Sequence, residues 1–460
     1  MRIRTSLFIA GSVFVVTARA ANLVPNPDFD DGLNGWSMNG TSGVMTLDSD
    51  IGFPAAPSLH LMADTLNPTL GAGALSQCIP ADDATRYDFF FNASGGGVWG
   101  GVNAFSDSEC STPLGSVDTE AYSNGVGTFG VTDFLLPGGT QSARVFLASI
   151  YGIGSAAGDT HYDHILFGAT GTLLDGININ QEGLTGTWYN PTTSGQGMQF
   201  VIQPDVANPA TGVLFGAWYT YDIAAGGADT QRWYSIQAQI SSGATVAPVT
   251  IYQNTGGNFD ALPTTTAVPI GTGTIQFGSC TFGEFTYALD DGRSGTIAIN
   301  SLLPNIDCVE TGTPTNPPSD VGFSGTWYDP ALGGQGLIID VRPIDPSGVN
   351  TQIFAGWYTY ASNGAANSGA TGQRWFSAQG PNTISTGSST LSLYESTGGT
   401  FDSSATVVET DPVGTATLTF NSCTSATFTY QFNAGELAGT SGSIDLSRLG
   451  AIPTSCTTTD

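Results

Sequence analysis

The chain has 460 residues, of which 62 are Gly and only 10% are charged, and its formal net charge is −28 with no Lys. This balance excludes nucleic acids and anionic membrane surfaces as partners, because both are bound through basic surface. A hydrophobic share of 40% and an aromatic share of 10% are sufficient to fill a core and argue against disorder.

The first 20 residues have the pattern of a secretory signal peptide. Arg2 and Arg4 precede an apolar run at 7–16, and Ala18-Arg19-Ala20 is typical of a cleavage site. A bilayer-spanning helix needs about 20 apolar residues, so this run is too short to be an anchor. We therefore expect export with cleavage near Ala20. No later segment is long and apolar enough to predict a transmembrane segment.

The block that follows, residues 21–174, contains short strand-like segments. It opens with "NLVPNPDFDDGLNGW" from Asn22 and continues through "YDFFFNA" from Tyr87 to "HYDHILFG" from His161. On these segments the block resembles carbohydrate-binding modules of the CenC type. The resemblance implies a jelly-roll β-sandwich that binds glycan or polysaccharide.

The same resemblance implies a metal site. Members of the family often hold a structural calcium ion with the acidic residue of the opening motif and the Asp of the last strand. These positions are Asp30 and Asp163 here, and oxygen ligands suit Ca²⁺. The alternative is a module without metal. Trp99, in "GGGVWGGV", is the candidate for stacking on a sugar, and its alternative is an ordinary place in the core.

All three histidines, His60, His161 and His164, lie in this first block. His161 and His164 form H-x-x-H, but residues three apart on a strand face opposite sides, which argues against a shared zinc ion. The chain contains no H-E-x-x-H and no G-x-S-x-G. It therefore lacks common signatures of metal-dependent and serine hydrolases.

Residues 182–308 and 321–456 are two copies of one module, joined by a Pro/Thr-rich linker at 309–320. "GTWYNP", "FGAWYTY" and "IYQNTGGNFD" in the first copy match "GTWYDP", "FAGWYTY" and "LYESTGGTFD" in the second. Met198, Phe200 and Ile202 recur at every second position, as in a strand with one buried face. About eight such segments occur in each copy, separated by turn residues. They predict an up-and-down barrel, with a two-sheet sandwich as the alternative.

The opening of the first copy, "LTGTWYN", is similar to the first strand of avidin and streptavidin, which are eight-stranded barrels that bind biotin. In that family the Asn after Trp-Tyr contacts biotin, which corresponds to Asn190. The second copy has Asp329 there, and "PTTSGQG" departs from the family's loop. The resemblance therefore supports a barrel rather than a ligand. The tandem copies also resemble a module of secreted proteins from Gram-negative bacteria.

The candidate ligand-binding residues of the repeats are aromatic and Arg side chains that occur at matching positions in both copies. Their ring faces suit stacking on sugars, and amides and hydroxyls lie nearby in the sequence. The alternative is packing, because Trp and Tyr also dominate cores and seal small barrels. The candidates are Trp188, Tyr189, Trp218, Arg232 and Trp233 in the first copy, and Trp327, Tyr328, Trp357, Arg374 and Trp375 in the second.

Six cysteines are distributed two to a block, at matching places in the two repeats. No C-x-x-C occurs, so the common zinc and redox motifs are absent. An exported chain with this distribution is expected to form three structural disulfides. The predicted pairs are Cys78–Cys110, Cys280–Cys308 and Cys423–Cys456.

The sequence thus predicts an exported, all-β, non-catalytic protein that binds glycan or polysaccharide through its first block. The repeats would add valency or reach. No cofactor is expected apart from the calcium ion. One alternative is an extracellular glycan hydrolase with an unrecognised carboxylate pair. The only Glu in a repeated motif is Glu395, and its counterpart is Gln253. A second alternative is small-ligand binding inside the barrels.

Overall fold

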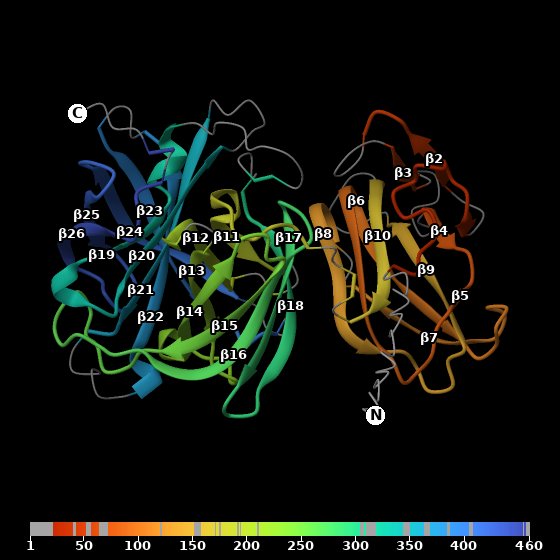
Figure 1. Ribbon diagram of the computed structural model, residues 1–460, viewed down its shortest axis with the longest axis horizontal. Helices are drawn as coiled ribbons and strands as arrows, with labels where there is room; N and C mark the ends of the chain where they lie inside the picture. The colour runs from red at the N-terminus through yellow and green to blue at the C-terminus, as the bar shows by residue number, and fades with distance from the viewer. Residues whose placement is uncertain are drawn as a thin grey trace, which may run out of the picture.

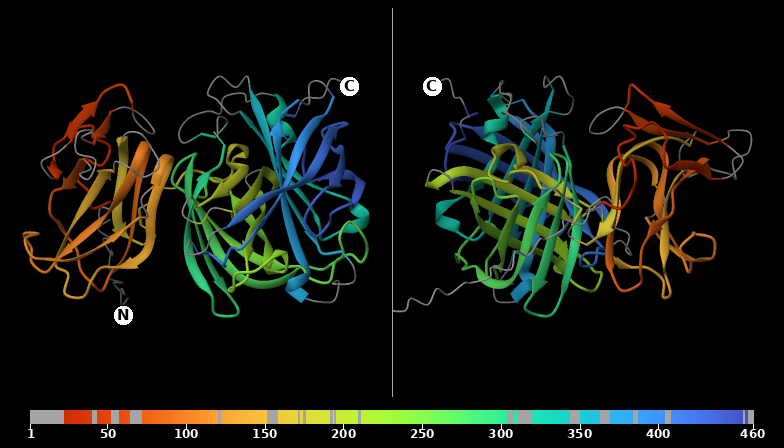
Figure 2. Two further views of the ribbon diagram at one scale, coloured as in Figure 1. Left: turned by 180° about the vertical axis from the view of Figure 1, so that it is seen from behind. Right: turned by 45° about the vertical axis from the view of Figure 1, so that its right-hand side comes forward.

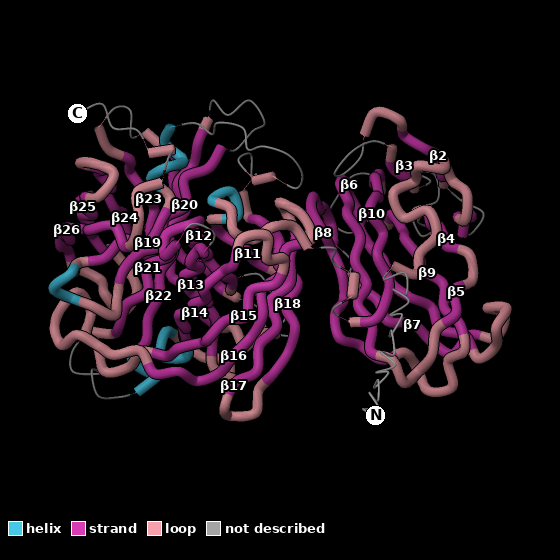
Figure 3. The backbone as a smooth tube through the Cα atoms, viewed as in Figure 1, coloured by secondary structure: helices cyan, strands magenta, loops and turns pink. Residues whose placement is uncertain are grey.

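The protein is all-β, as predicted (Figures 1 and 3). Among the described residues the only helices are short 3-10 turns, and none is long and apolar enough to cross a bilayer. The predicted signal peptide and positions 310–318 of the predicted linker lie outside these residues. The computed structural model describes residues 22–39, 43–51, 57–63, 72–119, 122–150, 158–170, 172–173, 176–190, 193, 195–208, 211–303, 308–309, 319–343, 350–362, 369–383, 387–403, 408–453 and 455–456.

The N-terminal block forms a 10-stranded sheet that folds over one core (Figure 2). Its strand order is β1-β4-β9-β6-β10-β3-β2, with β5 on β9 and both β7 and β8 on β6. The strands are β1 (Trp36–Asn39), β2 (Val44–Asp48), β3 (Ser58–Met62), β4 (Ala72–Ser76), β5 (Ile79–Pro80), β6 (Arg86–Phe105), β7 (Pro113–Asp118), β8 (Tyr122–Leu135), β9 (Ser142–Ser149) and β10 (Asp159–Ala169).

The long strand β6 belongs to both layers of this sandwich. Its first half pairs with β8 and β10, and its second half pairs with β7 and β9. The strand turns from one layer to the other at Gly95 and Gly97, which have φ of +141° and +79°. A Cβ at Gly97 would lie 2.0 Å from the Ile150 carbonyl oxygen, so only glycine fits. Residues of both layers, such as Phe91 and Val145, meet in the core.

Each repeat forms a closed barrel of eight consecutive antiparallel strands, which decides for the barrel over the two-sheet alternative. Full closure removes the free edges that an open sheet would expose. The first barrel consists of β11 (Gly186–Tyr189), β12 (Gly197–Asn208), β13 (Thr211–Tyr221), β14 (Gln231–Ser241), β15 (Val246–Gln253), β16 (Val268–Phe277), β17 (Phe282–Leu289) and β18 (Ser294–Ser301). The second consists of β19 (Gly325–Tyr328), β20 (Gly336–Pro343), β21 (Thr351–Tyr360), β22 (Gln373–Pro381), β23 (Ser389–Thr397), β24 (Glu409–Phe420), β25 (Ser425–Phe432) and β26 (Ser441–Leu449).

An aromatic side chain from each repeat packs against the interior Trp of the other repeat's barrel. In the first barrel, Trp218 lies 5.0 Å from Tyr287 between ring centroids, and Phe401 of the second repeat packs 5.2 Å from the same Trp. In the second barrel, Phe259 of the first repeat lies 5.2 Å from Trp357. The repeated "GGNFD" and "GGTFD" segments therefore each pack against the barrel of the other repeat.

Hydrogen bonds across the barrel interface come in matched pairs. The Gln231 side-chain amide donates to the Trp375 carbonyl at 3.0 Å, and the Gln373 amide donates to the Trp233 carbonyl at 2.6 Å. Tyr287 donates to Asp402 at 2.7 Å in one barrel, and Tyr430 donates to Asp260 of the other repeat at 2.6 Å. The two copies thus pack as a pseudo-symmetric pair within one chain.

The sandwich docks on the first barrel through β8 and β18, which lie side by side (Figure 1). Thr128 and Asn300 exchange two hydrogen bonds of 3.0 and 2.8 Å. Phe90 packs edge-on against Phe282 at 4.7 Å between centroids. The layer that contains β8 and β10 is therefore partly covered, whereas β7 and β9 lie on the side away from the barrels.

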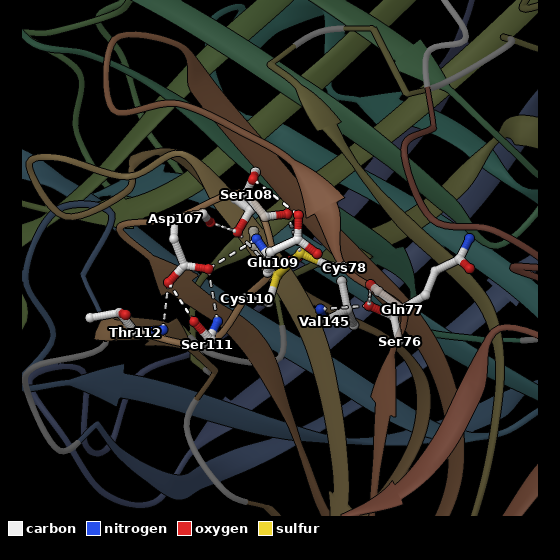
Figure 4. Close-up of a disulfide and its surroundings, with 12 residues drawn as sticks. Ser76, Gln77, Cys78, Asp107, Ser108, Glu109, Cys110, Ser111, Thr112 and Val145 are labelled. Carbon is white, nitrogen blue, oxygen red and sulfur yellow. Dashed lines mark hydrogen bonds between the residues drawn. A yellow bond between two sulfur atoms is a disulfide. The ribbon is translucent and has the colours of Figure 1, made fainter.

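All three predicted disulfides are present, as Cys78–Cys110, Cys280–Cys308 and Cys423–Cys456. Figure 4 shows the first of them beside a tight turn centred on Asp107. The Asp107 carboxylate accepts hydrogen bonds from the backbone N–H groups of Glu109, Ser111 and Thr112. These hydrogen bonds, with that of Ser111 contributing most, hold the pKa of Asp107 well below its usual range. The turn places Cys110 opposite Cys78.

Candidate functional site

The six Trp candidates of the repeats are all buried. Trp188 and Trp327 are fully buried, and each donates its indole N–H to a carbonyl of the turn before its strand, at Leu184 and Phe323. Trp218 and Trp357 fill the barrel interiors. Trp233 and Trp375 lie in the barrel interface, which also holds Tyr219, Tyr221, Tyr358 and Tyr360. The repeated Trp residues therefore pack the barrels and join them.

The Arg candidates stabilise loops at the ends of the barrels. Arg232 is 5% exposed, forms an ion pair with Asp222 and donates to two backbone carbonyls. Arg374 is 6% exposed and pairs with Glu436 at 2.7 Å in the same way. Both guanidinium groups thus have carboxylate partners within their own repeat.

The half-buried Tyr189 lines a cleft between the barrels, and its counterpart Tyr328 is also half-buried. The cleft has a volume of about 240 Å³, and Gln199, Ser377 and Gln379 also face it. Pockets for small molecules usually span about 300–1,000 Å³, so this cleft is small. It lies on the outside of the barrels, whose interiors are filled by side chains.

Trp99 differs from these residues because it lies on an outer face. It follows the bend of β6, where Val98, Val102 and Ala104 point into the core. Alternation along the strand turns Trp99 and Asn103 to the opposite side. The Trp99 ring is half-buried and packs edge-on against Phe146 of β9, 5.0 Å between centroids.

Polar groups share the outer face of β6 with Trp99. Its indole N–H donates to the exposed Asp118 carboxylate of β7 at 3.4 Å. Gly101 brings β7 close, because a Cβ there would lie 2.6 Å from that of Asp118. Asn103 pairs in register with Arg144 of β9, whose buried Nε has no hydrogen-bond partner among the described residues. We call this surface, made of Trp99, Asn103, Asp118, Arg144 and the buried Phe146, the open face.

Sequence reasoning identified only Trp99 of the open face. Asn103, Asp118, Arg144 and Phe146 come from three strands, and no motif connects them. The alternation along β6 could have indicated Asn103. The partners on β7 and β9 required the strand register.

The two residues predicted to hold calcium lie in different environments. Asp30 is exposed in the turn before β1, whereas Asp163 is 1% exposed within β10 and accepts a hydrogen bond from the His164 N–H at 2.8 Å. Neither belongs to the group of three metal-ligand residues found among the described residues. The calcium site stays a prediction.

Buried carboxyl groups with a raised pKa lie at contacts between the blocks and within the second repeat. Burial, with a smaller effect from the Asp88 charge, raises the pKa of Glu284 to about 8 where barrel 1 meets the sandwich. Burial raises the pKa of Asp402 to about 6 in the exchanged loop. Burial also raises the pKa of Glu395, where nearby Glu436 adds to the shift.

No family model matches the chain, and no curated protein matches it. Among solved structures, the chain is similar to the enzymatically active domain of tailspike protein 4 from bacteriophage CBA120, with a TM-score of 0.26 and 16% identity over 32% of this chain and 21% of that one. It is also similar to the CBM22-1–GH10 modules of endo-1,4-beta-D-xylanase 10B from Clostridium thermocellum, complexed with xylohexaose. That match has a TM-score of 0.24 and 12% identity over 38% of this chain and 34% of the other.

A third similarity is to the tandem CBM22-1–CBM22-2 modules of Xyn10C from Paenibacillus barcinonensis. It has a TM-score of 0.23 and 9% identity, over 65% of this chain and 96% of that one. The chain thus spans about a fifth and a third of the lengths of the first two structures.

Proposed function

We propose that the protein is an exported, non-catalytic binding protein that holds a neutral glycan on the open face of its N-terminal sandwich. The observation that carries the proposal is the half-buried Trp99 beside Phe146, with amide, guanidinium and carboxylate groups on the same face. A sugar ring presents C–H groups to an aromatic ring and hydroxyls to its rim. The open face offers partners for both.

The charge of the chain favours a neutral ligand. A formal net charge of −28 repels acidic polysaccharides. Hydroxyl groups, in contrast, can donate to the Asp118 carboxylate and accept from the Arg144 guanidinium.

Export is part of the proposal, and the three disulfides support it, since such bonds persist in oxidising compartments. The paired barrels would add reach as one packed unit. Their filled interiors give no support to a small ligand inside them.

The test is a binding screen of the full chain against soluble neutral and acidic polysaccharides, followed by titration calorimetry with the best ligand. Trp99→Ala should weaken binding at least about tenfold, which corresponds to the loss of about 1.4 kcal/mol of stacking. The control is Tyr394→Ala, which removes a half-buried aromatic from the outside of barrel 2.

Equal binding by Trp99→Ala and the wild type would place the ligand elsewhere on the chain. Binding of no polysaccharide at all would refute glycan recognition. Hydrolysis of a bound polysaccharide would instead favour the enzyme alternative.

A further inference from the structure

Two histidines from distant parts of the chain form a direct cross-strand pair on the sandwich. His60 of β3 lies opposite His161 of β10 in the antiparallel register. Their rings are stacked, with centroids 4.2 Å apart and planes inclined by 3°. The neighbouring strand β2 adds Asp48, whose carboxylate accepts a hydrogen bond from His161 Nε2 at 3.1 Å. Three adjacent strands thus bring three metal-ligand side chains together.

The donor atoms of Asp48, His60 and His161 all lie within 4.8 Å of one another. Atoms bound to one tetrahedral zinc ion are about 3.3 Å apart, given bonds of about 2.0–2.1 Å. Small side-chain rotations therefore bring the three atoms onto one ion. Asp159 lies beside them, 2.6 Å from His60 Nε2.

The cluster is partly buried but reachable from solvent. The side chains of His60 and His161 are 17% and 15% exposed, and that of Asp48 is 26% exposed. Strands fix the backbone of all three residues, which lowers the entropy lost when an ion binds. The ligand set has two imidazoles and one carboxylate, so a bound ion keeps a coordination position open towards solvent.

We propose that Asp48, His60 and His161 form a binding site for a first-row divalent cation of the Zn²⁺ type. Imidazole nitrogen suits Zn²⁺, Cu²⁺ and Ni²⁺, whereas Ca²⁺ takes oxygen ligands. The site is therefore distinct in chemistry and in residues from a calcium site at Asp30 and Asp163. A bound ion would fasten β2 and β3 to β10 at the edge of the sheet. It would also offer its open position to a donor atom of a ligand.

The alternative role of the cluster is structural, as two carboxylate–imidazole pairs without metal. Calorimetric titration of the full chain with ZnCl₂, and separately with CaCl₂, distinguishes the two. We expect one saturable Zn²⁺ site per chain, an increase of the melting temperature with Zn²⁺ and its reversal by chelator.

Variants assign the site to these residues. His60→Ala and His161→Ala should each lower the Zn²⁺ affinity at least about tenfold. The matched control is His164→Ala, because His164 lies on the same strand but interacts with Asp28 at 2.7 Å instead. If a His variant fails to fold, Asp48→Asn, which keeps the shape of the side chain, provides the same measurement.

Absence of a saturable Zn²⁺ site in the wild type would overturn the proposal. So would undiminished binding in the His60→Ala, His161→Ala double variant. The result is independent of glycan binding, since the cluster and the open face lie in different layers of the sandwich.

Discussion

The sandwich and the paired barrels use tryptophan in opposite ways. In the barrels, Trp233 and Trp375 are 1% and 5% exposed and hold the two repeats together. In the sandwich, Trp99 is half-buried on an outer face. Repetition of an aromatic motif therefore marks an internal interface in this chain. Candidates for an external ligand lie in the block that is not repeated.

The largest expected effect separates these two uses. Trp233→Ala removes a buried ring and its 3.0 Å hydrogen bond to the Thr359 carbonyl, so we expect a loss of about 3–5 kcal/mol of unfolding free energy. Trp99→Ala should cost less than about 1 kcal/mol, because the ring is partly solvated. Urea unfolding of both variants measures the difference. Equal destabilisation would mean that Trp99 is a core residue after all.

A smaller effect is expected for the polar pairs of the barrel interface. In Gln231→Leu, the buried N–H and C=O groups of Trp375 each lose a hydrogen bond. This should lower the free energy of unfolding by about 1–3 kcal/mol. Gln237→Leu is the matched control, since Gln237 is exposed on the same strand β14. Thermal unfolding of the two variants compares them. A neutral outcome for Gln231→Leu would indicate that the repeats associate through apolar packing alone.

The third expected effect concerns the contact of barrel 1 with the sandwich and depends on pH. Glu284 has a folded-state pKa of about 8 against an ordinary value of 4.5, so the folded protein keeps a proton that the unfolded chain releases. Its contribution is complete below about pH 4.5 and falls by up to about 1.4 kcal/mol per pH unit until about pH 8.

Glu284→Gln should abolish this contribution, because the amide keeps the shape without the charge. Unfolding free energies of wild type and variant, measured from pH 5 to pH 8, should therefore diverge as the pH rises, with the variant becoming the more stable. Parallel curves would show that Glu284 titrates normally. Asp402, whose pKa is raised to about 6, is present in both proteins and cancels in the difference.

Local patterns predicted what depends on neighbours in the sequence. Alternation at Met198, Phe200 and Ile202 predicts a strand, and eight such segments predict a barrel in each copy, with the two-sheet sandwich as the alternative. The positions of the cysteines in the two repeats identified the disulfide pairs. These features follow from the two-residue period of a strand and from the similarity of the two copies. Both can be read from a single sequence.

The candidate sites required information that no local pattern holds. The H-x-x-H pattern relates His161 to His164 on one strand. The partner of His161 in the structure is His60, 101 positions away and opposite in register. Likewise, Asp118 contacts Trp99, and Arg144 shares its face, only because β6 bends at its glycines and pairs with both β7 and β9.

By itself, the sequence determined an acidic all-β chain of three blocks with two barrel-forming repeats, because composition and strand period are properties of the residues alone. Tertiary structure decided which aromatic residues are interface and which are exposed. The exchange of Phe259 and Phe401 between barrels buries the repeated motifs. This burial depends on the packing of two whole barrels against each other. The surfaces that pack are formed only when the barrels fold.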